Sequence, residues 1–65
     1  MAKENELRRI LEARGTSQAW LARKTGLGVG TVNEIVQQKR APTLENARKI
    51  AKALGVRVEE IWPEE

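Results

Sequence analysis

The side chains that could do chemistry in this sequence are carboxylates, amides, hydroxyls, lysines and arginines, because its 65 residues include no histidine and no cysteine. Histidine is the commonest general base and metal ligand, and cysteine supplies thiolate ligands and disulfides. The adjacent carboxylate pairs are Glu59 with Glu60 and Glu64 with Glu65. Neighbours on a helix do not face the same way, so neither pair suits acid–base catalysis. The sequence therefore predicts no catalytic constellation, no metal site and no cofactor.

The run Gly-Leu-Gly-Val-Gly at residues 26–30 is the other candidate for chemistry, because glycine-rich loops can bind phosphate. A nucleotide-binding loop of this kind needs a preceding strand and a following Gly-Lys-Ser/Thr, and the sequence has neither. We interpret the run as a turn followed by the start of a helix.

Charge is unevenly distributed along the chain, although the total is only +3. Residues 1–13 have no net charge, residues 14–52 carry +6 and residues 53–65 carry −3. A basic middle segment suits a surface that faces a polyanion, with the acidic end held away from it. A solvated surface of mixed charge explains the same distribution, so charge alone does not decide.

Apolar residues recur at helical spacing along the chain, and capping residues mark where the helices begin and end. Ser17 and Thr43 are favoured N-caps. Gly15, Gly26 and Gly55 suit the left-handed conformation that ends a helix. The predicted helices cover about residues 4–14, 18–24, 29–37, 44–54 and 58–61.

These elements have short connections, and no segment alternates as a strand does. The sequence therefore predicts a compact all-α bundle of five helices, which forms one domain over residues 1–65. The predicted core comprises Leu7, Ile10, Leu11, Leu21, Ala22, Val32, Ile35, Leu44, Ala47, Ile50, Ala51, Leu54, Val56, Val58, Ile61 and Trp62.

Residues 18–37 have the pattern of two short helices joined at a steep angle. The motif needs a small residue at the crossing, a glycine in the turn, an apolar plug and apolar anchors. These are Ala22, Gly26, Leu27, and the anchors Leu21, Val32 and Ile35. With Ser-Gln-Ala-Trp-Leu-Ala-Arg-Lys-Thr-Gly-Leu at residues 17–27, the chain resembles the phage-repressor/Cro (Xre-like) helix-turn-helix family, a repressor-like bundle.

The resemblance covers about residues 5–62. A basic loop, a proline and a Thr-Leu-Glu helix start follow at residues 39–45, and Lys-Ile-Ala-Lys-Ala-Leu-Gly-Val at residues 49–56 matches the family's next segment. The resemblance implies a transcriptional regulator, a repressor of bacterial or phage type. It would bind double-stranded DNA with the third helix in the major groove and the second across the backbone.

Carried onto this sequence, the resemblance implies two sets of DNA-contacting residues. The base-reading set is Gly28, Val29, Gly30, Thr31, Asn33, Glu34 and Gln37. The phosphate-contacting set is Gln18, Arg23, Lys39, Arg40 and Thr43. In the first set, Asn33 could pair with adenine, Glu34 could accept from cytosine N4, and Val29 could touch a thymine methyl group.

The start of the third helix departs from the family pattern. Gly28 stands where members often carry Ser or Thr, and Val29 where they often carry a long polar residue. Gly28 and Gly30 each weaken a helix by up to about 1 kcal/mol. Two interpretations stay open: the glycines permit close approach to DNA, or they only make a loose helix start.

Three further positions depart from the family pattern. Gln38 stands where glycine is common, so a different exit from the third helix is one expectation. Trp20 stands where glutamate is common, and its indole could cover a seam between helices, contact the DNA backbone or join a protein interface. Val36 replaces a charged residue and is either half-buried or an exposed apolar spot.

The family usually binds as a homodimer on a two-fold operator. We expect the dimer surface on the last helix and tail, although Trp62 could instead belong wholly to the core. The residues concerned are Val58, Ile61, Trp62 and Pro63.

Two alternatives remain: an antitoxin that also binds a partner toxin, and a helix-turn-helix used only for protein interaction. No apolar run approaches the roughly 18 residues of a membrane span, and the N-terminus lacks the apolar core of a signal peptide. A cytoplasmic location is therefore expected, with no membrane contact.

Overall fold

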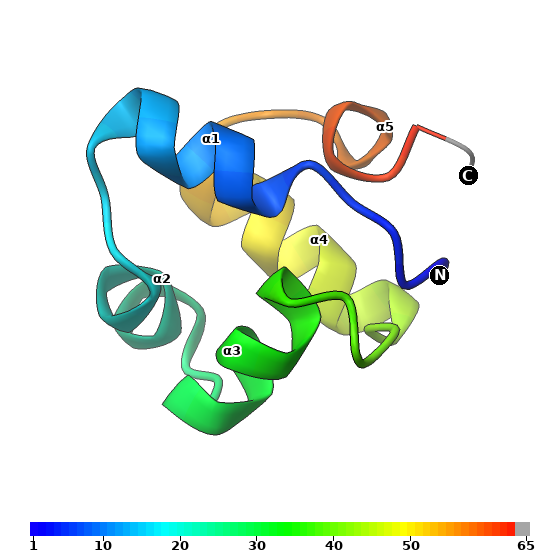
Figure 1. Ribbon diagram of the computed structural model, residues 1–65, viewed down its shortest axis with the longest axis horizontal. Coiled ribbons are helices and arrows are strands. Elements are labelled where there is room, and N and C mark those ends of the chain that lie inside the picture. Colours follow the sequence, from blue (N-terminus) through cyan, green and yellow to red (C-terminus); the bar gives the residue numbers. More distant parts are fainter. Residues whose placement is uncertain (64–65) are drawn as a thin grey trace.

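The structure, a computed structural model, describes residues 1–63 (Figure 1). Glu64 and Glu65, counted above in the acidic end, lie outside the described residues. The described part holds five helices and no strand, which confirms the all-α prediction. The helices are α1 (Leu7–Arg14), α2 (Gln18–Thr25), α3 (Val29–Val36), α4 (Leu44–Leu54) and α5 (Val58–Ile61).

The predicted helix ends are largely confirmed, because the caps form as expected. Ser17 accepts a hydrogen bond from the Trp20 backbone N–H at 3.0 Å, and Thr43 accepts one from Asn46 N–H at 3.1 Å. The glycines at the ends of α1, α2 and α4 all have a positive φ, and these are Gly15, Gly26 and Gly55. The bounds of α4 and α5 are those predicted, α2 is one residue longer, and α3 is one residue shorter.

The core lies around α4, which crosses the middle of the molecule between α2 and α3 below and α1 and α5 above (Figure 1). Direct packing joins α4 to α2 and to α5, and α2 to α3. The prediction that Leu44 belongs to the core is wrong, because this side chain is 52% exposed. It occupies the first turn of α4, which lies at the edge of the molecule (Figure 1).

Three apolar side chains for which the sequence left alternatives open are buried. Val36 is only 2% exposed, so it is a core residue rather than a surface spot. Ile61 and Trp62 have no exposed surface at all. These two cannot form a surface for a second copy, so of the expected dimer residues only the half-buried Val58 and the exposed Pro63 reach the surface.

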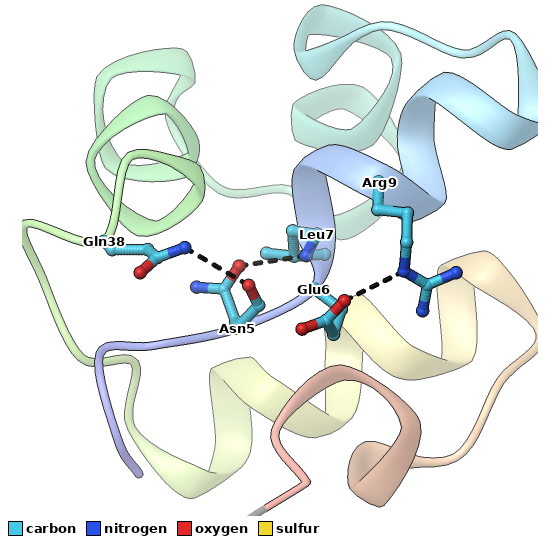
Figure 2. A network of polar contacts seen from close by, with 5 residues as sticks. All are labelled: Asn5, Glu6, Leu7, Arg9 and Gln38. Atoms are coloured by element: carbon cyan, nitrogen blue, oxygen red, sulfur yellow. Dashed lines mark hydrogen bonds and ion pairs between the residues drawn. The ribbon is translucent and has the colours of Figure 1, made fainter.

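The start of α1 is later than predicted because the side chain of Asn5 holds the preceding chain in a turn (Figure 2). Its Oδ1 accepts from the Leu7 backbone N–H at 2.9 Å, and its Nδ2 donates to Lys3 O at 2.9 Å and to Ile35 O at 2.8 Å. Asn5 is the one buried polar residue within residues 1–63. The N-terminal segment is thereby fastened to the C-terminal turn of α3.

The exit from α3 is made by Gln38, which adopts the left-handed conformation with φ 63°. Its backbone N–H donates to Ile35 O at 3.0 Å, and Lys39 N–H donates to Glu34 O at 2.9 Å. The side-chain Nε2 of Gln38 also donates to the backbone oxygen of Asn5 at 3.3 Å (Figure 2). The helix therefore ends with the geometry of a glycine C-cap, although no glycine is present.

Replacing Gln38 by glycine is expected to stabilise the protein by about 0.5–1 kcal/mol. A non-glycine residue in the left-handed region costs about 1–2 kcal/mol, and the loss of the long side-chain bond to Asn5 offsets part of the gain. Thermal unfolding followed by circular dichroism measures the change. Gln37→Gly is the control: Gln37 has φ −81°, so glycine there should destabilise. Equal stability of Gln38→Gly and wild type would mean that the left-handed conformation of Gln38 is not strained.

None of the helices described for residues 1–63 is long and apolar enough to cross a membrane.

Candidate nucleic-acid interface

The α2–turn–α3 unit is held by side chains that the sequence pattern identified. Ala22 and Leu21 face inward from α2, with 4% and 0% of their surface exposed. Val32 and Ile35 anchor α3 from the other side, at 0% and 1% exposed. Leu27 is half-buried against the same core. The predicted locking residues of the motif are confirmed, so the angle between α2 and α3 is fixed by buried contacts.

Thr25 strengthens the turn between the two helices. Its hydroxyl donates to Leu21 O at 2.8 Å, and its Oγ1 lies 3.3 Å from the Leu27 backbone N–H, which donates to it. Gly26 supplies the left-handed residue, with φ 78°. Because both ends of the turn are tied to α2, the first residue of α3 is placed in a fixed position.

The face of α3 opposite the buried anchors carries the expected base-reading residues. Positions 29, 33 and 37 are separated by four residues each, and so are 30 and 34, so they share one side of the helix. Gly28, Val29, Gly30, Glu34 and Gln37 are exposed. Thr31 and Asn33 are half-buried. The expected base-reading residues therefore form one continuous surface, with Thr31 at its margin.

A hydrogen bond joins the first residue of α2 to the middle of α3. Asn33 Nδ2 donates to Gln18 Oε1 at 2.9 Å. This bond fixes the plane of the Asn33 amide while it leaves Oδ1 and the second N–H of Nδ2 free. Those two groups are the acceptor and donor that asparagine uses to recognise adenine. Gln18, expected to contact phosphate, thus also orients a residue expected to read a base.

An ion pair joins α3 to the loop that follows it. Arg40 Nη1 lies 3.0 Å from Glu34 Oε1, and the two side chains are 55% and 52% exposed. An exposed pair of this kind contributes little to stability, at most about 1 kcal/mol. Its consequence is positional, because it holds the Arg40 guanidinium beside the exposed face of α3. It also occupies one oxygen of the carboxylate expected to accept from cytosine.

The other expected phosphate-contacting residues are exposed, and fewer contacts hold their side chains in place. Lys39 lies three residues after the end of α3, and Thr43 caps the N-terminus of α4. Arg23 stands apart, in the last turn of α2. The Gln18–Asn33 and Glu34–Arg40 contacts join the start of α2 and the loop 37–43 to α3, whereas no contact of this kind within residues 1–63 fixes Arg23.

A hollow of about 350 Å³ lies at the start of α2. Arg8, Thr16, Ser17 and Gln18 contribute to its lining. The Thr16 hydroxyl is buried and has no hydrogen-bond partner among the described residues. The N-terminus of a helix favours anions, and a guanidinium adds to that preference. Arg8 was not among the expected phosphate-contacting residues, because it belongs to α1 and only the fold brings it here.

Trp20 lies on α2, half-buried against the core. Lys24 Nζ lies 6.0 Å from the centre of its ring, one helical turn further on. Of the three interpretations left open by the sequence, this packing supports the indole as a cover over a seam between helices.

Comparison with known families gives one match that spans most of the chain. A family described as helix-turn-helix matches residues 7–61, which include all five helices. A search of curated proteins found no match. Within residues 1–63, no group of three or more acidic side chains is placed to hold a metal ion.

Proposed function

Because the chain belongs to the Cro/C1-type helix-turn-helix family, a family of DNA-binding proteins, we propose that it is a transcriptional regulator that recognises one DNA sequence. In this proposal α3 lies in the major groove and α2 crosses the backbone. The protein would act in the cytoplasm where the DNA lies, and it would repress by occupying an operator that polymerase needs.

The observation that carries this proposal is the hydrogen bond between Gln18 and Asn33. An asparagine whose amide is already oriented loses less side-chain freedom when it binds a base. The bond leaves the two groups needed for adenine free.

The proposed phosphate contacts flank this base-reading surface. The start of α2 with Gln18 and Arg8 supports one phosphate site, and Thr43 with the first turn of α4 supports a second. Lys39 and Arg40 add positive charge next to α3. Phosphate contacts of this kind set the position of the protein on the duplex, whereas the base contacts set the sequence. The contribution of Arg23 stays a prediction from the family resemblance.

We further propose that the regulator binds as a homodimer to two half-sites about one helical turn apart. The surface of α5 around Val58 and Pro63 is the part of the expected interface that is accessible. Selection of duplexes from a random pool tests both proposals. A two-fold motif is the expected result. A single half-site would contradict the dimer, and no enrichment at all would contradict sequence-specific binding.

Alanine substitutions at Asn33 and Arg40 should separate base reading from phosphate contact. Asn33→Ala should relax the preference at one base pair of the selected motif by about 1–3 kcal/mol. Arg40→Ala should weaken binding to all sequences alike and reduce the slope of log affinity against log salt by about 1. Fluorescence anisotropy with the selected and scrambled duplexes measures both effects.

The control for Arg40→Ala is Arg57→Ala, which removes the same charge from the segment before α5, on the opposite side of the molecule from α3 (Figure 1). Its effect on affinity should be clearly smaller. If Asn33→Ala weakened binding to all sequences by the same factor, Asn33 would not be a base-reading residue. Equal losses from Arg40→Ala and Arg57→Ala would mean that only net charge matters.

A further inference from the structure

Gly28 and Gly30 differ from the other three glycines of the chain. Gly15, Gly26 and Gly55 have positive φ angles and end helices, whereas Gly28 and Gly30 do not have a positive φ. A Cβ atom built on Gly30 would meet nothing within 4 Å, and one on Gly28 would meet only the Thr31 hydroxyl at 4.0 Å. The fold therefore has room for a side chain at both positions.

Gly30 is the position that the fold leaves unexplained. Gly28 is the N-cap of α3, where glycine is acceptable. Gly30 lies inside the helix, where glycine is less favourable than alanine. It is exposed, and it lies on the same side of α3 as Glu34, one turn further on. A residue that weakens the helix and leaves open space on this surface is explained if something outside the protein uses the space.

Val29 stands between these two glycines and is 57% exposed. It is one of two large apolar side chains that are exposed in residues 1–63, and the other, Leu44, lies on α4. A valine in a helix has one strongly preferred rotamer, so its methyl groups are held in one direction. Because neither neighbouring residue has a side chain, Gly28 and Gly30 do not shield these methyl groups at the start of α3.

The apolar group that a base edge offers in the major groove is the C5 methyl of thymine. We propose that Val29 and Gly30 together select thymine: the Val29 methyl groups contact the C5 methyl, and the missing side chain of Gly30 lets the start of α3 come close enough for that contact. The inference rests on the proposed function and assigns Gly30 as a specificity-determining residue through the space it leaves.

The test uses the duplex selected by the wild-type protein and the same duplex with uracil in place of thymine, one position at a time. Uracil keeps the hydrogen-bonding groups of thymine and lacks only the methyl group. Wild-type affinity should fall about fourfold at one position in each half-site, the factor that corresponds to one buried methylene-sized group. The other thymine positions of the duplex serve as internal controls.

Two variants test whether Gly30 and Val29 are the residues that cause the preference for thymine over uracil. Gly30→Ala should raise the Tm of the free protein by about 4 °C and lower affinity for the thymine duplex at least fivefold, because the added methyl group occupies the required space. It should lose less affinity on the uracil duplex. Val29→Thr keeps the side-chain shape but replaces one methyl group by a hydroxyl, and it should distinguish the thymine duplex from the uracil duplex less than wild type does, because only one methyl group remains.

The outcomes separate this inference from the proposed function. A wild-type protein that enriches no duplex would overturn the proposed function. A wild-type protein that enriches a motif but binds its thymine and uracil forms equally would overturn only the selection of thymine. A Gly30→Ala variant that is more stable and binds as tightly as wild type would show that the space at Gly30 has no role.

Discussion

Replacing Trp62 by alanine is expected to remove a large share of the free energy of unfolding of the protein. The side chain has no exposed surface, although it lies only three residues from the end of the 65-residue chain. Truncating a buried tryptophan to alanine costs about 3–5 kcal/mol. At about 0.05–0.15 kcal/mol per residue, a domain of this size has a total stability of about 3–10 kcal/mol. Far-ultraviolet circular dichroism during a urea titration measures the loss.

Trp62→Phe is the matched control for this prediction. The indole Nε1 has no hydrogen-bond partner in the part of the chain that the structure describes, so phenylalanine removes volume but breaks no hydrogen bond. We expect this variant to remain folded and to lose about 1–2 kcal/mol. A Trp62→Ala variant with wild-type stability and weaker self-association would instead favour the dimer surface first expected from the sequence.

Replacing Asn5 by alanine is expected to have the second large effect, and it should lower the free energy of unfolding by about 2–3 kcal/mol. One side chain satisfies three backbone groups, and its longest-range bond reaches Ile35 O across 30 residues of sequence. Each hydrogen bond contributes about 1 kcal/mol net, and a buried group left without a partner costs more. The urea midpoint should fall with little change in slope, because the unfolded state is unaffected.

Asn46→Ala is the control for Asn5→Ala, since it makes the same chemical change at a half-buried position of α4. The hydrogen bond at Asn46 is donated by its backbone N–H, which alanine retains. Its effect should stay within about 0.5 kcal/mol of wild type. Equal stability of the two variants would mean that the Asn5 contacts contribute nothing beyond solvation.

The elements predicted well from the sequence are those whose signals are local. The bounds of α4 follow from Thr43 and Gly55, which are a cap and a stop adjacent to the helix. The motif of α2 and α3 is likewise defined by short spacings. Local signals also contained one clue that was missed: asparagine is a favoured capping residue, and Asn5 stands two residues before Leu7, the first apolar residue of α1.

Contacts between distant residues could not be predicted in this way. The bond from Asn5 to Ile35 and the approach of Arg8 to Gln18 depend on how the helices pack. The pairing of Asn33 with Gln18 depends on the angle between α2 and α3. Apolar spacing identifies the side of a helix that faces inward, but it does not tell where the helix passes beyond its neighbours, which is why Leu44 was placed in the core.

The conformation of Gln38 could not be predicted from the sequence for a different reason. Glycine predicts a left-handed residue because it adopts that conformation without strain, and the chain has glutamine there instead. The backbone still follows the path of a glycine-ended helix, because the buried anchors of α3 and the start of α4 fix both sides of the turn. Packing thus overrides the local preference at this one residue.

The most direct test of DNA recognition is the affinity of the wild-type protein for its selected duplex and for a scrambled duplex across a series of salt concentrations. The account predicts binding to the selected duplex at least about 10³-fold tighter than to the scrambled one, with affinity for both falling steeply as salt increases. Equal affinity for the two duplexes, or no binding to either at low salt, would contradict it.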